Sequence, residues 1–158
     1  MSSEINFKDK KLIVLDLNGV LIHRNRKDVE LRPYVHQFLD KLFESNFQVA
    51  IFSSCKEKNG KPLVNNIFYK YNFEFLWFRD RCKFDPEDDG FSTIKDINDI
   101  VSNPVINCDR IYTKNNILFI DDSKNKMRFN PKDTYYIIPS FKGEVDDELL
   151  NLMDKIDK

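Results

Sequence analysis

Glycine and cysteine are scarce in this chain, and both shortages exclude classes of protein. Only 4 glycines occur among 158 residues, which rules out collagen-like and glycine-rich low-complexity chains. The three cysteines, Cys55, Cys82 and Cys108, are widely spaced and form no CxxC pair. This pattern favours reduced thiols over a disulfide framework or a zinc site. We therefore expect an intracellular protein, cytoplasmic or nuclear.

Long hydrophobic runs and an excess of charge of one sign are also missing. No apolar run approaches the roughly 18 residues that a membrane span needs, and the polar N-terminal segment lacks the apolar centre of a signal peptide. The formal net charge is −1, so no overall charge recruits nucleic acid or an anionic membrane. With 41% hydrophobic and 32% charged residues, we expect one domain over residues 1–158, with a sizeable core and no membrane association.

Short apolar runs alternate along the chain with stretches in which apolar residues recur at helical spacing. The runs predict buried strands and the stretches predict amphipathic helices. Strands that alternate with helices indicate βαβ units, so we predict an α/β fold with a single Rossmann-like, doubly wound, mainly parallel five-stranded sheet. A charged, turn-rich segment at about residues 79–91 predicts a small hairpin insertion. The predicted strands cover residues 12–15, 47–52, 73–78, 117–120 and 135–138, and the predicted helices cover residues 33–44, 63–71, 93–101 and 145–156.

Polar side chains stand at the ends of three predicted strands. Asp16 follows the first strand, Ser53 the second, and Asp121 with Asp122 the fourth. Parallel strands bring their carboxyl ends to one edge of a sheet, where open α/β sheets bind their ligands. Taken singly, each of these residues also fits an ordinary turn.

Together, these groups are suited to phosphate chemistry. Carboxylates brought close to one another repel and need a cation, and hard carboxylate oxygens suit Mg²⁺. Ser53 can donate a hydrogen bond to a phosphoryl oxygen, and Lys95 can neutralise the charge that builds on it. An ionised Asp16 is a competent nucleophile for an aspartyl-phosphate intermediate.

Six short motifs resemble those of the haloacid dehalogenase superfamily, in order and at similar spacing. The match is to the branch of phosphatases that act on the C-terminal domain of RNA polymerase II, and it extends from about residue 12 to residue 141. The family patterns are DxDxTLVH, LRPG…FL, FTAS, FRESCVF, KDL and VDNSP, and the corresponding segments here are residues 16–23, 31–39, 51–55, 78–84, 95–97 and 120–123.

The resemblance implies a role for each matching residue. Asp16 would be the nucleophile and a Mg²⁺ ligand, and the backbone carbonyl of Asn18 would complete the metal site with the carboxylates of Asp121 and Asp122. The phosphoryl group would be held by Ser53, Ser54, Arg79 and Lys95. This branch has no large cap domain, only the hairpin insertion, so its site admits a protein segment more readily than it encloses a small metabolite.

One position departs from the family pattern. The second aspartate of the first motif, which protonates the leaving group and then activates water, is Asn18 here. An amide cannot transfer a proton, and general acid–base catalysis contributes about 10²–10⁴-fold to a rate. Asn18 could still ligate a metal through its backbone carbonyl, so the departure affects turnover more than binding.

Three functions therefore stay open. The first is a Mg²⁺-dependent phosphatase, weakened by Asn18, that acts on phosphoserine or phosphothreonine in protein segments. The second is a pseudophosphatase that binds a phosphorylated partner without consuming it. The third is a phosphatase for small phosphometabolites or for nucleic-acid ends.

Positive charge recurs after the predicted strand ends, which suggests a basic rim around the site. Such a rim would attract a polyanionic segment, either a multiply phosphorylated peptide or nucleic acid. The alternative is ordinary loop polarity, partly cancelled by the acidic residues 85–89. The rim would consist of Arg24, Arg26, Lys27, Lys56, Lys58, Lys61, Arg79, Arg81, Lys83, Lys124, Lys126 and Arg128.

Overall fold

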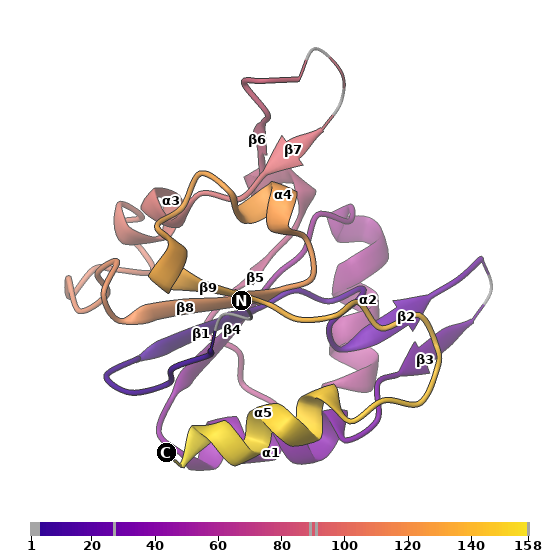
Figure 1. The fold of residues 1–158 in the computed structure, drawn as a ribbon. Coiled ribbons are helices and arrows are strands. Elements are labelled where there is room, and N and C mark those ends of the chain that lie inside the picture. The colour runs from indigo at the N-terminus through magenta and orange to yellow at the C-terminus, as the bar shows by residue number, and fades with distance from the viewer. Residues whose placement is uncertain (1–3, 27, 89, 91, 158) are drawn as a thin grey trace.

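A five-stranded parallel sheet forms the centre of the computed structural model, which describes residues 4–26, 28–88, 90 and 92–157 (Figure 1). The strand order is β5-β4-β1-β8-β9, and all four neighbouring pairs are parallel. This arrangement confirms the predicted doubly wound α/β sheet. The strands are β1 (Leu12–Leu15), β4 (Gln48–Phe52), β5 (Leu76–Trp77), β8 (Ile117–Asp121) and β9 (Tyr135–Ile137).

Both faces of the sheet are covered, because successive side chains of each strand point to opposite sides. Ile13 and Leu15 of β1 pack into one apolar core with α1 (Val35–Glu44), α2 (Glu57–Ile67) and α5 (Glu148–Ile156). Leu12 and Val14 face a second core, which includes α3 (Ile97–Val101) and α4 (Lys124–Met127). The strand is therefore buried on both faces, which explains its unbroken apolar sequence.

Two predicted elements have different bounds in the structure. Only Leu76 and Trp77 of the predicted strand 73–78 form the strand β5. Backbone hydrogen bonds also join Glu74 and Phe75 to β4, and the Phe73 ring packs against Phe43 of α1. The helix predicted at 63–71 is α2, which begins at residue 57 and ends at residue 67. Gly60 favours a loop by sequence, but it lies in this helix, where a Cβ would come within 2.4 Å of the Phe78 ring.

Two other helices begin later than predicted. Helix α1 starts after Tyr34, which has a left-handed backbone conformation with a φ of 70°, so Pro33 precedes the helix and does not open it. Helix α5 starts at Glu148, and Val145 is 89% exposed outside it.

Two antiparallel hairpins leave the sheet at its carboxyl edge. One joins β2 (Ile22–Arg24) to β3 (Val29–Leu31), in a segment where no strand is predicted from the sequence. The other joins β6 (Lys83–Phe84) to β7 (Thr93–Ile94) and projects from the body of the molecule (Figure 1). The insertion therefore begins and ends later than predicted, since residues 79–81 form a 3₁₀ turn.

The prediction of a helix over residues 93–101 was wrong for residues 93–96, because α3 begins at Ile97. Thr93 and Ile94 belong to β7, and the Asp96 side chain caps α3 by accepting a hydrogen bond from the Asn98 backbone N–H. Lys95 thus lies between a strand and a helix, in the segment that turns back toward the sheet. Within the described residues, no helix has the length and apolar character to cross a membrane.

Candidate functional site

Three carboxylates meet at the carboxyl edge of the sheet. Asp16 follows β1, and Asp121 ends the adjacent parallel strand β8, with Leu15 paired to Ile120 just before them. Asp16, Asp121 and Asp122 each offer an oxygen, and these oxygens all lie within 4.8 Å of one another. Asp16 is 8% exposed and Asp121 is 1% exposed, so their mutual repulsion is poorly screened by water.

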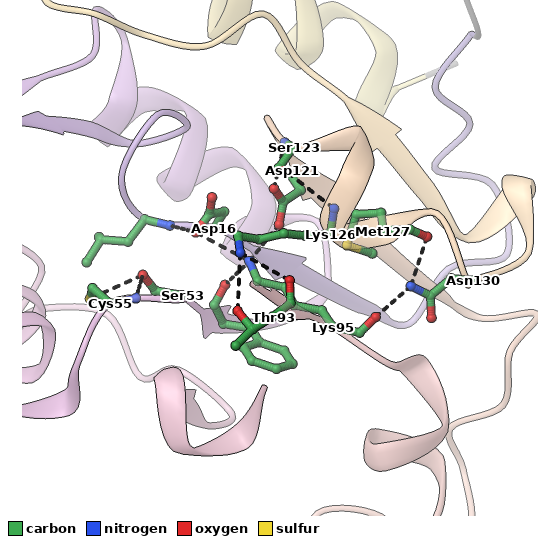
Figure 2. A network of polar contacts seen from close by, with 12 residues as sticks. Asp16, Ser53, Cys55, Thr93, Lys95, Asp121, Ser123, Lys126, Met127 and Asn130 are labelled. Carbon is green, nitrogen blue, oxygen red and sulfur yellow. Dashed lines mark hydrogen bonds and ion pairs between the residues drawn. The ribbon is translucent and has the colours of Figure 1, made fainter. Parts of the chain in front are cut away.

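Lys95 lies between two of these carboxylates (Figure 2). Its Nζ is 2.6 Å from Asp121 Oδ2 and 3.4 Å from Asp16 Oδ1, and it donates a hydrogen bond of 2.7 Å to the Phe52 carbonyl at the end of β4. Burial alone would lower the pKa of the Lys95 ammonium, but Asp121 and Asp16 hold that pKa above its ordinary value. Lys95 is therefore a fixed positive charge in the site.

Negative charge still predominates after this pairing. When all three carboxyl groups are ionised, the one ammonium leaves two negative charges in the cluster. Burial and the neighbouring Asp121 and Asp122 raise the pKa of the Asp16 carboxyl well above its usual range, although Lys95 partly opposes the shift. A second cation bound here would remove this repulsion and keep Asp16 ionised.

The donor set fits a hard divalent cation such as Mg²⁺. The oxygens are held by hydrogen bonds from outside the cluster: Leu17 N–H donates to Asp16 Oδ1 at 2.8 Å, Ser123 N–H to Asp121 Oδ1 at 2.9 Å, and Ser140 Oγ to Asp122 Oδ2 at 2.8 Å. Oriented carboxylate oxygens with a net charge of −2 meet the preference of this ion. Asp16, Asp121 and Asp122 are the residues that would hold it.

Ser53 follows β4, the strand beside β1, and Arg79 begins the 3₁₀ turn after β5. Ser53 follows Phe52, whose carbonyl contacts the Lys95 ammonium, and its Oγ accepts the Cys55 backbone N–H and donates to Cys55 Sγ, both at 3.2 Å. The exposed Arg79 donates its backbone N–H to the Cys55 carbonyl at 2.8 Å. The half-buried Ser54 lies between these bonded residues in the loop. The roles of Ser53, Ser54 and Arg79 in phosphate binding stay predictions.

The Asn18 side chain has a structural contact. Its Oδ1 accepts the Arg24 backbone N–H at 2.9 Å, which ties the turn after β1 to the end of β2. The residue itself is exposed beside the buried Asp16. An aspartate could accept the same hydrogen bond, so this contact does not require an amide.

The model of the NLI interacting factor-like phosphatase family matches residues 11–158. The chain belongs to this family. The match includes the cluster of Asp16, Asp121 and Asp122 together with Lys95, so the predicted resemblance to phosphatases of this type is confirmed.

Curated proteins similar to this family member are longer than it. CTD small phosphatase-like protein 1 of Caenorhabditis elegans is 25% identical over 169 residues, which cover 94% of this chain and 31% of that protein. An uncharacterized FCP1 homology domain-containing protein of Schizosaccharomyces pombe is 26% identical, with 78% of this chain and 58% of that protein covered. The mitochondrial import inner membrane translocase subunit TIM50 of C. elegans is 27% identical, with 89% and 29% covered. The chain thus spans less than two thirds of the length of these relatives.

Solved structures with the same fold are haloacid dehalogenase-like hydrolases and a C-terminal-domain phosphatase. The fission yeast RNA polymerase II CTD phosphatase Fcp1, in a variant bound to beryllium fluoride, has a TM-score of 0.57 and 13% identity, over 90% of this chain and 45% of that chain. A hydrolase of the superfamily from Geobacter sulfurreducens has a TM-score of 0.56 and 10% identity, over 99% and 100% of the two chains. At such identities the likeness shows the fold alone, and it confirms the predicted haloacid dehalogenase-like fold.

Arg32 is a residue of this family member that sequence reasoning missed. It is 1% exposed, and its guanidinium donates to the carbonyls of Gly19, Val20 and Pro139 and to Asp146 Oδ1 at 2.7–3.3 Å. It thereby joins the turn after Asp16 to the segment after β9. The arginine of the LRP segment is visible in the sequence, but its partners lie up to 114 residues away, so no local pattern reveals its position.

Asn130 was missed as well, because only its contacts show what it does. Its amide donates to the carbonyls of Lys95 and Met127 at 2.8 and 3.1 Å (Figure 2). Its Oδ1 accepts the Ile97 backbone N–H at 2.8 Å. The Lys95 backbone N–H in turn donates to the Lys126 carbonyl at 3.0 Å. The backbone of Lys95 is therefore fixed on both sides by the segment that contains α4.

The predicted basic rim is partly neutralised in the structure. Lys83 forms ion pairs with Asp96 and Asp99 at 2.8 and 3.1 Å. Arg128 pairs with Asp85 and Glu87 at 2.7 and 3.0 Å. Lys27 lies outside the described residues. Attraction of nucleic acid or another polyanion by this rim stays a prediction.

Proposed function

We propose that this protein is a Mg²⁺-dependent phosphatase that acts on phosphoserine or phosphothreonine in protein segments through an aspartyl phosphate on Asp16. The observation that carries the proposal is the buried Asp16 beside Asp121, Asp122 and the paired Lys95. Membership of the NLI interacting factor-like phosphatase family supports the reaction class. The similarity to a CTD small phosphatase-like protein supports a protein segment as the substrate.

In this mechanism, the residues of the chain carry out the displacement at phosphorus. A carboxylate oxygen of Asp16 attacks the phosphorus, a new P–O bond to Asp16 forms, and the bond to the serine or threonine oxygen breaks. Lys95 neutralises charge on the phosphoryl oxygens, and Ser53 and Arg79 bind those oxygens. Bound Mg²⁺ would supply further neutralisation of this charge. Water then hydrolyses the aspartyl phosphate and releases inorganic phosphate.

Asn18 determines which substrates turn over fast. The departing oxygen needs a proton when it is an alkoxide, and the amide of Asn18 cannot supply one. Water must then provide the proton, so hydrolysis loses about 10²–10⁴-fold relative to a site with a general acid. An aryl oxygen leaves without prior protonation, and we expect aryl phosphates to be the faster substrates.

The test is hydrolysis of an aryl phosphate by the wild type and by Asp16→Asn, each with Mg²⁺ and with a chelator. We expect Mg²⁺-dependent turnover in the wild type and none in the variant, which keeps the size of the side chain and loses the nucleophile. Equal turnover by both proteins would refute Asp16 as the nucleophile.

A second candidate function is recognition of a phosphorylated partner without turnover. The observation that favours it is the Asn18 amide, which is held by the Arg24 N–H beside an otherwise complete set of charged groups. In that case a phosphoserine peptide binds the wild type and is recovered with its phosphate after prolonged incubation with Mg²⁺. Release of inorganic phosphate from the peptide would exclude this function.

The proposed activity also fits a reducing compartment. Cys55, Cys82 and Cys108 are all free thiols, which is the usual state in the cytoplasm and nucleus. We therefore infer an intracellular location, cytoplasmic or nuclear, for this function.

A further inference from the structure

A groove runs from the candidate site along α3 to the segment 102–116. It consists of two adjoining hollows of about 410 and 590 Å³ that share Ser102, Asn103 and Pro104. The hollow nearer the site is lined by Trp77, Arg81 and Cys82, among other residues. The farther hollow is lined by Arg110 and Tyr112, among others. We call the two together the α3 groove.

The α3 groove begins beside the candidate site. Lys83 lines the groove and pairs in the β6–β7 hairpin with Ile94, the residue before Lys95. Arg79, just before the groove residues 80–83, is hydrogen-bonded through its backbone to Cys55 in the loop after Ser53. A protein segment with its phosphate at Asp16 can therefore continue into the groove.

The far wall of the groove is an ordered structure. The Asn107 side chain donates to the carbonyls of Val101 and Tyr112 and accepts the Tyr112 backbone N–H, all at 2.9 Å. The buried Tyr112 hydroxyl donates to Glu74. These bonds hold the segment 102–116 in a fixed shape, so a ligand would enter a groove that already exists.

The groove carries uncompensated positive charge. Among the described residues that line the groove, Arg81 and Arg110 form no ion pair, whereas Lys83 is already paired with two aspartates. The Arg81 guanidinium lies over the Trp77 ring, 4.9 Å from its centroid. Against these two arginines, Asp80 is the one carboxylate lining the described groove that has no cationic partner. The stacked guanidinium is also oriented before a ligand binds, which lowers the entropy lost on pairing.

We propose that the α3 groove binds acidic residues that flank the phosphorylated residue of an extended protein segment, with Arg81 pairing with a carboxylate. The proposal rests on the proposed phosphatase site and names the kind of segment that the site takes. Trp77 orients the Arg81 guanidinium, and the fixed segment 102–116 leaves room for the extended chain.

The experiment compares two labelled peptides that carry a non-hydrolysable phosphonate in place of phosphoserine. One peptide has aspartate and glutamate around the phosphonate, and the other has asparagine and glutamine at the same positions. Fluorescence anisotropy gives the Kd of each for the wild type, Arg81→Ala, Arg81→Lys and a control, Lys155→Ala in α5 on the far side of the sheet. The preference of the wild type for the acidic peptide should be roughly tenfold, as one charge-assisted hydrogen bond provides.

The variants then separate the proposal from general electrostatic attraction. Arg81→Ala should bind both peptides equally, Arg81→Lys should keep only part of the preference because lysine cannot stack as a planar group, and Lys155→Ala should behave as the wild type. An acidic-peptide preference that is unchanged in Arg81→Ala would overturn the proposal. So would tighter, Arg81-dependent binding of a 5′-phosphorylated oligonucleotide than of the acidic peptide.

Hydrolysis and peptide binding together show whether the groove proposal or the proposed phosphatase function has failed. If the wild type hydrolyses an aryl phosphate but binds both peptides equally, the groove proposal is wrong and the phosphatase site stands. If the wild type neither hydrolyses the aryl phosphate nor binds either peptide, both are wrong.

Discussion

At Gly19 the backbone passes too close to Asp122 for any side chain. A Cβ at this position would lie 2.0 Å from Asp122 Oδ2, and the φ of 91° disfavours residues other than glycine. Gly19→Ala should therefore lower the free energy of unfolding by at least about 1–2 kcal/mol for the backbone alone, and it should displace a carboxylate of the candidate metal site.

Urea unfolding and Mg²⁺ titration of Gly19→Ala measure these two effects. The matched control is Gly90→Ala in the β6–β7 hairpin, where the nearest heavy atom to a Cβ is the Asp88 Oδ1 at 3.3 Å. Gly19→Ala should be less stable than the control and should bind Mg²⁺ more weakly. A variant as stable as the control, with unchanged Mg²⁺ affinity, would show that Gly19 does not set the position of Asp122.

At the scale of elements, Arg32 joins the turn after β1 to the chain after β9. Replacing it with alanine would leave the buried carbonyls of Val20 and Pro139 without their side-chain donor. The Gly19 carbonyl and Asp146 Oδ1 would each keep one backbone N–H donor. Each buried carbonyl left without a donor costs about 1–3 kcal/mol, so we expect Arg32→Ala to lower the free energy of unfolding by about 2–6 kcal/mol. Arg32→Lys should recover little of it, because lysine lacks the planar fork that reaches several acceptors.

Chemical denaturation of these variants gives the free energies directly. Lys41→Ala is the comparison, since its pair with Asp157 is exposed and should contribute about 1 kcal/mol or less. A loss of less than 1 kcal/mol in Arg32→Ala would mean that Arg32 does not hold the two segments together.

The central elements could be predicted from the sequence, and the edge elements could not. β1, β4 and β8 are buried on both faces, so each shows an unbroken apolar run that identifies it. The edge strand β5 is only two residues long, and the Phe73 ring at the start of the predicted strand packs on Phe43 of α1. α2 was displaced in the prediction because Gly60 favours a loop by sequence, although here the glycine allows a helix to approach Phe78.

The residues of the candidate site likewise divide into those that the sequence predicts and those that only the structure shows. Asp16, Ser53, Asp121 and Asp122 could be found because each follows an identifiable strand. Lys95 lies between a short strand and a short helix, so no strand end marks it, and it was indicated by the charge that phosphate chemistry needs and by the family resemblance. Arg32 and Asn130 bind backbone carbonyls that are far away in the sequence. These contacts form only in the folded chain, so no local sequence pattern predicts them.

At the scale of the whole molecule, the charge of the cluster couples metal binding to stability. A ligand that binds the native state alone stabilises it by about 2.7 kcal/mol at 100 times its Kd. For a chain of this size, that corresponds to a rise in Tm of roughly 5–10 °C. We therefore expect Mg²⁺ to raise the Tm of the wild type, because it offsets the two residual negative charges of the cluster.

Differential scanning calorimetry with and without Mg²⁺ tests this coupling. Asp122→Asn should lose most of the rise, whereas Asp133→Asn, an exposed residue before β9, should keep it. An equal rise in both variants would place the Mg²⁺ outside the cluster.

The most direct measurement of whether the site lacks only its proton carrier is hydrolysis of an alkyl phosphate by Asn18→Asp. The aspartate can still accept the Arg24 N–H, so the fold should be unchanged, and an exposed Asn151→Asp in α5 is the control for added charge. We predict that Asn18→Asp raises the alkyl phosphate rate by about 10²–10⁴-fold over the wild type, with a smaller gain on an aryl phosphate. The claim that the site lacks only its proton carrier would be contradicted by an Asn18→Asp protein that is folded and binds Mg²⁺ but hydrolyses the alkyl phosphate no faster than the wild type.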